Sequence, residues 1–598
     1  MIVLISGLIL LSIPFVLIDL FSDKKRGFIY ILFFSLLFQT ILAVLSQSFG
    51  IFYYWVVSGF TILADIVALF IYFRIKNKSG NFSISFKISD WVLLAVVLMS
   101  LLALYQVHYN YTGLISTATD TTQAYHQERN MVYPYPYFSD EWYAVSLIQG
   151  ATGNHSLPVK NVLNNTFFPN LELFFHSLIA ELMLILGFSP LLQYTALSIF
   201  INALIILSVY LFLRISGISK LTSGVSSLFL LYITSGATLP GLWHLIPFNL
   251  GILFFILSLC FMNFQDRKLV FLSVILASLF YPPLIPFYFM GLAVFLLSTA
   301  RTPPKQLFKN VFKYLFLFLL ISLIVYIALV FSPLEKYVKY ILSRIFFISF
   351  TYPFLPQLNF YDIIPWPAII LAIFGVYYIY KNKKWVLLSE LILGAVYWIL
   401  YTQSTYRFFA EYERISIFTS ILAVVISGFG FFLIGNYIKS KFKTHGYKWF
   451  IAVELLIFII FVLMVPSYTS LGSWKKNTAI NPSTGLVIYP KSPANTYLTQ
   501  EDIKIFQGIE EKKFLSIPWK GTVIGVATNN YPVLTKQGTI SIGSDYILND
   551  FLKADCKNKI QIANKLRLDY IYLYSFNCPE FKKISESSGG LILYSVEQ

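Results

Sequence analysis

Runs of roughly 20 apolar residues recur along most of the chain, separated by short polar turns. A bilayer core about 30 Å thick is crossed by roughly 20 residues of helix, so runs of this length are typical of membrane spans. The pattern predicts a mostly α, polytopic membrane helical bundle of about fourteen helices. They are expected at residues 1–20, 28–46, 51–73, 91–108, 190–213, 222–238, 248–263, 269–281, 284–299, 314–331, 366–380, 385–402, 415–435 and 449–466.

The segment 171–186 is apolar but short, and it carries Glu172, His176 and Glu181. If this segment does not cross, alternate loops hold 22 Lys and Arg residues, whereas the opposite loops hold seven. Lys and Arg concentrate in cytoplasmic loops. We therefore expect a re-entrant or interface-lying helix at 171–186, with both the N-terminus and the C-terminal tail outside. Residues 1–20 lack a basic start and a cleavage site, which favours a retained span.

Composition agrees with a membrane protein. Of 598 residues, 57% are hydrophobic and 12% are charged, about half the charged fraction of a soluble protein, which excludes a soluble enzyme. The net charge of +16 is spread over many loops and forms no single stripe, so we expect no nucleic-acid partner.

From about residue 467 onward, Lys, Asp, Asn and Gly return, and short β-rich runs are expected at Gly521–Ala527 and Tyr570–Tyr574. We expect additional transmembrane helices at 1–90, a transmembrane catalytic region at 91–466 with a large outer loop at 109–170, and a soluble extracytoplasmic α/β domain at 467–598. Cys556 and Cys578 lie in this tail, where an oxidising compartment permits a disulfide; two free thiols are the alternative.

The large loop holds the most informative residues. Asp140 and Glu141 are adjacent carboxylates among aromatic residues that include Tyr137 and Trp142. A carboxylate there can remove a proton from a hydroxyl or ligate a divalent cation. The alternative is that Ser139 caps a helix, expected to end near Gly150, and that the two carboxylates complement its dipole.

The outer segment that opens a late span contains Arg407 and Arg414, two helical turns apart, so both would point to one side of a continuous helix. Arginine can hold a phosphate with two parallel hydrogen bonds. The alternative is that they pair with Glu411 and Glu413 or meet lipid headgroups.

Three features together resemble the GT-C superfamily of membrane glycosyltransferases: the Asp-Glu pair at the start of a surface helix, a glycine about ten residues later, and Phe168, Pro169 and Asn170 before an apolar helix. The chain is similar to the protein O-mannosyltransferase and aminoarabinose transferase type. The resemblance covers residue 91 to the end.

The resemblance implies a sugar donor carried on a polyprenyl phosphate, an acidic loop residue at the reacting centre and an arginine at the donor phosphate. Asp140, Glu141, Arg407 and Arg414 are the matching positions. The chain departs from the family in its three extra N-terminal helices and in lacking the Trp-Trp-Asp signature and a second Asp-x-Glu motif. These absences favour sugar transfer without a metal; a divalent cation is possible but not favoured.

Weaker candidates for a substrate cavity are Tyr137, Trp142, His244, Tyr281 and Tyr406. His155 and His176 have no second ligand at metal spacing. Lys336, Lys339 and Arg344 lie on an amphipathic stretch that would meet headgroups. Nucleotide-binding and nucleophile motifs are absent from the sequence, as expected for a donor that arrives activated.

The sequence therefore predicts a plasma-membrane glycosyltransferase acting on the extracytoplasmic side. It would transfer sugar from a polyprenyl-phosphate donor to a hydroxyl of a glycan, lipid or protein. The alternatives are a transporter or flippase for lipid-linked sugars, and a polysaccharide polymerase or ligase of related architecture.

Overall fold

The computed structural model describes thirteen stretches of the chain. They are residues 27–76, 91–117, 124–159, 163, 170, 172–233, 241–299, 363–403, 412–471, 479–480, 487–489, 494–535 and 544–596. The predicted helices at 1–20 and 314–331 lie outside them. So do Arg407, Tyr406 and the stretch containing Lys336.

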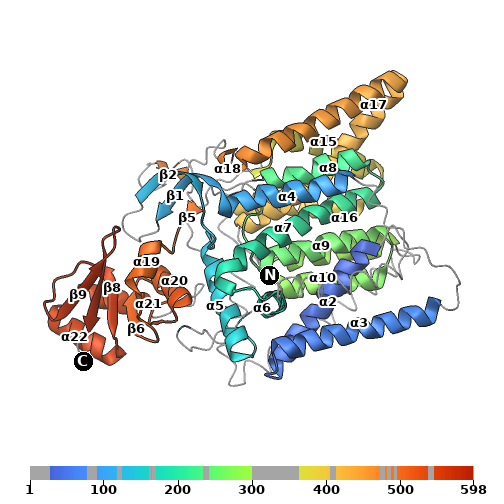
Figure 1. Ribbon diagram of the computed structural model, residues 1–598. Coiled ribbons are helices and arrows are strands. Elements are labelled where there is room, and N and C mark those ends of the chain that lie inside the picture. The colour runs from blue at the N-terminus through green and yellow to red at the C-terminus, as the bar shows by residue number, and fades with distance from the viewer. Residues whose placement is uncertain are drawn as a thin grey trace.

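A bundle of apolar helices makes up most of the described chain (Figure 1). Its helices are α2 (Gly27–Ser48), α3 (Tyr54–Lys76), α4 (Trp91–Tyr109), α6 (Leu173–Leu186), α7 (Pro190–Ile215), α8 (Lys220–Leu228), α9 (Pro247–Asn263), α10 (Arg267–Phe280), α11 (Ile285–Thr299), α15 (Trp366–Lys381), α16 (Trp385–Gln403) and α17 (Tyr412–Met464). Six helical segments are long and apolar enough to cross a membrane, and five more are shorter and apolar. The predicted mostly α, polytopic fold class is confirmed.

Helix α17 corresponds to two predicted spans, not one. The rings of Phe431 and Phe450 are 5.3 Å apart, whereas 19 residues of straight helix rise about 28 Å. The chain must therefore turn back between these two residues. The candidate spans Tyr412–Phe442 and Lys448–Ser467 match the two predicted helices.

The predicted helix at 222–238 is shorter than expected. Helix α8 ends at Leu228, one 3-10 turn follows (η1, Phe229–Tyr232), and Ile233 is extended. The carbonyls at this end bond to groups outside the helix: Leu231 O accepts from Tyr468 Oη at 2.6 Å, and Ile233 O from Gly241 N at 2.6 Å. Within the described residues the helix therefore ends before Ile233.

Both ends of α6 lie on the side of the bundle that carries the 109–170 loop, here called the loop side. Gln47, at the end of α2 next to the α2–α3 turn, bonds to Ser177 O in the first turns of α6. After α6 ends at Gly187, α7 starts at Pro190, and Thr195 in its second turn donates to Pro134 O of the loop. This geometry supports the expectation that 171–186 does not cross.

The described part of the 109–170 loop contains more secondary structure than the sequence predicts. It forms β1 (Tyr111–Thr117), β2 (Ala124–Met131) and α5 (Ser139–Asn154). Strand β1 pairs with β2 antiparallel and with β5 (Ala494–Asn495) of the tail in parallel. Helix α5 continues past Gly150, where we expected its end, to a left-handed cap at His155.

The tail contains a five-stranded sheet in the order β7-β6-β8-β10-β9 (Figure 1). Its strands are β6 (Lys513–Ser516), β7 (Tyr531–Pro532), β8 (Tyr570–Tyr574), β9 (Phe581–Glu586) and β10 (Leu591–Val596). The helices between and before them are α19 (Gln500–Ile505), α20 (Pro518–Thr528), α21 (Ser544–Lys553) and α22 (Cys556–Leu566). Strand β8 covers the predicted run, and the tail has the expected α/β character. The remaining short elements are η2 (Pro282–Leu284), η3 (Val465–Ser467), α18 (Tyr468–Leu471), β3 (Ala479–Ile480) and β4 (Val487–Tyr489).

The prediction of a β run at Gly521–Ala527 is wrong, because these residues belong to α20. Pro518 occupies the first turn, where a missing N–H costs nothing. Gly521 and Gly525 face the neighbouring β7 segment so closely that a Cβ at Gly521 would lie 2.2 Å from Leu534 O. Packing against that segment therefore overrides the β propensity of Val523 and Ile524.

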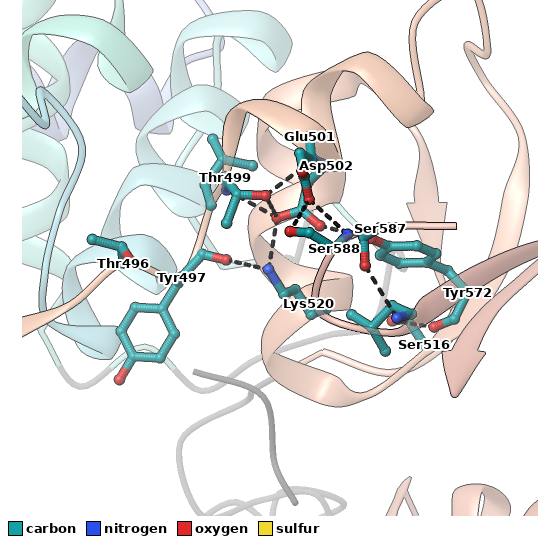
Figure 2. Close-up of polar contacts among 12 residues, drawn as sticks. Thr496, Tyr497, Thr499, Glu501, Asp502, Ser516, Lys520, Tyr572, Ser587 and Ser588 are labelled. Carbon is teal, nitrogen blue, oxygen red and sulfur yellow. Dashed lines mark hydrogen bonds and ion pairs between the residues drawn. The ribbon is translucent and has the colours of Figure 1, made fainter. Parts of the chain in front are cut away.

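Helix α20 fastens the tail to α5. Gln149 Nε2 donates to Val526 O at 3.2 Å, and Leu498 N donates to Tyr133 Oη at 3.1 Å. Beside this contact, Lys520 Nζ lies 2.6 Å from Asp502 Oδ2 and donates to Tyr497 O, while Tyr572 Oη donates to Asp502 Oδ1 (Figure 2). These buried groups satisfy one another, so we assign them to the structure of the tail.

Candidate functional site

The site lies at the start of α5, which runs across the loop side between the bundle and the tail (Figure 1). Phe138 is extended and precedes the first helical residue, Ser139, so Ser139 is not the cap itself. Glu141 performs the capping, since its Oε2 accepts from Phe138 N at 3.3 Å. Asp140 and Glu141 are consecutive helical residues and point about 100° apart.

Asp140 faces solvent and Arg414. Its side chain is 51% exposed, whereas that of Arg414, in the first turn of α17, is 7% exposed. The Arg414 Nη2 to Asp140 Oδ2 distance is 3.9 Å. The guanidinium also lies 5.3 Å from the ring centroid of Phe138 and 6.0 Å from that of Phe248. The Arg414 guanidinium is thus held beside two aromatic rings, and the carboxylate of Asp140 lies next to it.

Glu141 points into the protein and is fully buried. Its Oε1 accepts from Leu245 N at 2.8 Å, which joins α5 to the loop at 241–246. Burial raises the pKa of Glu141 to about 8, the nearby Asp140 charge raises it further, and the two backbone N–H groups act in the opposite direction. Glu141 therefore serves as a clamp between two loops.

The loop at 241–246 is fixed by side chains of the bundle. Three carbonyls accept from α7: Trp243 O from Ser198 at 3.3 Å, His244 O from Asn202 at 3.0 Å, and Leu245 O from Tyr194. Asn249 links this network, since its Oδ1 accepts from Ile246 N at 3.1 Å and its Nδ2 donates to Asn202 at 2.7 Å. The backbone that carries His244 is therefore preorganised.

The His244 ring lies at the centre of this arrangement. It is buried and packs against Phe138 and Trp243, with centroid distances of 5.5 and 4.8 Å. Burial and then the charge of Arg414 hold the pKa of His244 well below its usual range, so the ring is neutral at pH 7. Neither ring nitrogen has a hydrogen-bond partner within the described part of the chain. A neutral imidazole in which neither nitrogen is hydrogen-bonded can donate one hydrogen bond and accept another.

The remaining aromatic candidates are buried in the core around the site. Tyr137 is buried and stacks on His108 at 4.8 Å, and Trp142 is buried and donates from Nε1 to Pro136 O at 3.0 Å. Tyr281 packs on Phe248 at 5.4 Å, behind Arg414. The structure therefore brings Asp140, Arg414 and His244 together, whereas Tyr137, Trp142 and Tyr281 lie in the surrounding core.

The other histidines have structural contacts. His155 bonds to Phe52 O at 2.8 Å, and His176 Nδ1 lies 3.1 Å from Asn170 Oδ1. Among the described residues, one group of three His, Cys, Asp or Glu side chains has ligand atoms within 4.8 Å, namely Cys556, Cys578 and Glu580. Both of its cysteines are joined in a disulfide.

Sequence reasoning missed Tyr194, Ser198, Asn202 and Asn249. A signal was present, because polar side chains inside apolar helices are costly unless they bond to something specific. The sequence alone could not identify the 241–246 loop as their partner.

Known structures resemble this fold at low identity. The crystal structure of the apo Archaeoglobus fulgidus oligosaccharyltransferase aligns with 86% of this chain and 75% of its own, at 12% identity and a TM-score of 0.47. The oligosaccharyltransferase AglB of the same organism, in complex with an inhibitory peptide and a dolichol-phosphate, aligns over the same shares at 13% identity and a TM-score of 0.46. No family model and no curated protein matches the chain.

Proposed function

We propose that this protein is a membrane glycosyltransferase of GT-C type that transfers sugar from a polyprenyl-phosphate donor to an acceptor hydroxyl. The observation that carries the proposal is the meeting of a half-exposed carboxylate, Asp140, with a buried arginine, Arg414, at one end of an apolar helical bundle. A base and a phosphate-binding cation in one place at the membrane surface are what transfer from a lipid phosphate requires.

Asp140 is the general base in this proposal, and Glu141 is not. Asp140 reaches solvent, so an acceptor can approach it. Glu141 is buried, and both of its oxygens already accept backbone N–H groups. Its role is to fix the position of the start of α5, which carries Asp140, relative to the 241–246 loop, which carries His244.

Arg414 binds the donor phosphate in this proposal. A phosphate at the guanidinium would take over the contact that Asp140 makes at 3.9 Å, leaving the carboxylate free to accept a proton. The aromatic rings of Phe138 and Phe248 keep the guanidinium in place during that exchange. Donor binding would thus activate the base.

The reaction is a single displacement. The acceptor O–H transfers its proton to Asp140, and the oxygen forms a bond to the anomeric carbon. The bond from that carbon to the phosphate oxygen breaks, the electron pair leaves with the polyprenyl phosphate, and Arg414 stabilises the added charge. The configuration at the anomeric carbon inverts.

His244 orients one of the substrates in the same site. Its buried ring nitrogens have no described hydrogen-bond partner, and its backbone is fixed by α7 and Asn249. Because the ring is neutral, it can bond to a sugar or acceptor hydroxyl without competing with Arg414 for the phosphate.

The site faces the extracytoplasmic side of the plasma membrane in this proposal. The excess of Lys and Arg in the loops at the opposite end of the bundle supports this orientation. The acceptor is a glycan, lipid or protein hydroxyl.

The test uses the full chain purified in detergent with synthetic polyprenyl-phosphate hexoses, and follows release of polyprenyl phosphate. Asp140→Asn should lower the rate about a hundred- to ten-thousand-fold while donor binding and thermal unfolding stay near wild type. Addition of EDTA should leave the wild-type rate unchanged.

Glu128→Gln is the matched control, because it changes another carboxylate of the large loop, on β2. It should leave the rate of polyprenyl-phosphate release unchanged. An Asp140→Asn variant that releases polyprenyl phosphate at the wild-type rate would contradict the proposal. A flippase would show no release in detergent and would move the donor only between two compartments.

A further inference from the structure

A second group of buried polar atoms lies away from the proposed site, where α6 packs against α2. It consists of Gln47 on α2 and Ser177 and Glu181 on α6, here called the α2–α6 cluster. These three residues are at most 1% exposed. Gln47 Nε2 donates to Ser177 O at 3.1 Å, and this carbonyl lies one helical turn before Glu181. Ser177 and Glu181, four residues apart, share one face of α6.

The orientation of the Gln47 amide follows from its partner. A backbone carbonyl only accepts, so the nitrogen of Gln47 must face Ser177 O and its Oε1 must face elsewhere. That oxygen has no hydrogen-bond donor among the residues that the structure describes. Ser177 Oγ and both carboxylate oxygens of Glu181 likewise have no hydrogen-bond partner among the described residues. The cluster therefore presents four buried oxygens without a described partner, and the Ser177 hydroxyl is the one among them that carries a proton to donate.

Glu181 forms no ion pair with any residue that the structure describes. The salt bridges of Arg414, Lys512, Lys520 and Lys583 go to other carboxylates. A buried carboxylate without a partner is strongly unfavourable, so it must gain either a proton or a cation. A protonated Glu181 and the Ser177 hydroxyl would supply two donors to the four oxygens, whereas a metal cation contacts several oxygens at once.

We propose that the α2–α6 cluster binds a monovalent metal cation such as Na⁺. One carboxylate balances one positive charge, and an amide, a hydroxyl and a carboxylate are the hard oxygen ligands that such ions take. The bound ion joins α2 to α6, which also packs on α5. This inference is independent of the proposed function.

Binding of radioactive Na⁺ to the full chain in detergent tests the proposal, with choline chloride holding the ionic strength constant. We expect saturable binding and a thermal unfolding midpoint that rises with Na⁺ concentration, as for any ligand specific to the native state. Glu181→Gln should abolish both effects. Gln47→Leu and Ser177→Ala should weaken Na⁺ binding, and they keep the test decisive if Glu181→Gln fails to fold.

Glu390→Gln is the matched control, because Glu390 on α16 is also a fully buried glutamate whose oxygens have no described hydrogen-bond partner. It should leave Na⁺ binding intact. The proposal is overturned if the wild type shows no saturable Na⁺ binding, which would point to a protonated Glu181. It is equally overturned if Glu181→Gln retains binding or Glu390→Gln loses it.

Discussion

Glu141 Oε1 accepts the N–H of Leu245 at 2.8 Å, so the helix that carries Asp140 is bonded to the loop that carries His244. The contact joins residues 104 positions apart in the sequence. It also makes the geometry of the proposed site depend on one buried carboxylate.

The first prediction concerns pH and Glu141. Its pKa is raised from 4.5 to about 8 in the folded protein, so the native state binds more protons than the unfolded state between these values. Stability should therefore be highest below about pH 4.5 and fall by a few kcal/mol as the pH rises through about 8. Thermal unfolding of wild type and Glu141→Gln across this range measures the difference. A pH dependence that is unchanged in the variant would contradict the assignment.

The second prediction concerns Arg414. Arg414→Ala should weaken donor binding, and Arg414→Lys should restore it only in part, because lysine lacks the planar fork that holds phosphate with two bonds. Titration with a synthetic polyprenyl-phosphate sugar measures both variants. Arg267→Ala, at the opposite end of the bundle from the proposed site, is the control. Equal donor affinity in the wild type and Arg414→Ala would mean that Arg414 only anchors the fold.

The third prediction concerns His244. His244→Ala should lower the transfer rate, and it should also lower the unfolding temperature, because it leaves a cavity beside Phe138 and Trp243. His244→Gln, which keeps a donor and an acceptor, should recover part of the rate. A variant series in which activity follows stability alone would show that the ring is only a packing group.

The fourth prediction concerns Cys556 and Cys578, which the structure joins in a disulfide across 22 residues. Loop closure of this length stabilises a fold by about 3 kcal/mol. The double serine variant should therefore lower the unfolding temperature of the tail, as should a reducing agent on the wild type. Mass spectrometry without reduction, on protein from its native compartment, should find the bond. Two free thiols there would refute it.

The fifth prediction is topological. Single cysteines placed at exposed positions near Arg129 in the large loop and near Lys582 in the tail should both react with a membrane-impermeant reagent on intact cells. A cysteine near Lys383, between α15 and α16, should not react. Labelling of the opposite pattern would reverse the proposed orientation.

The sequence was sufficient for the long helices because a membrane span is recognised by its length and apolarity, as α7 is. It also indicated Asp140 as a candidate, since an acidic pair among aromatic residues is unusual. It could not separate Asp140 from Glu141, because that distinction depends on which face of α5 meets the 241–246 loop. It missed α20 for a related reason: Gly521 and Gly525 make the helix possible through contacts with a segment elsewhere in the chain.

The pairing of β1 with β5 has a consequence for how the protein is made. Ile115 and Ala494 are register partners, so the sheet beside the proposed site needs a strand that the ribosome delivers late. The bundle can insert span by span during translation, but the loop bearing Asp140 completes its sheet and its contact with α20 only after the tail has emerged and folded. Chains truncated before the tail would therefore occupy the membrane without an assembled site, and maturation would depend on when the tail is synthesised and folds.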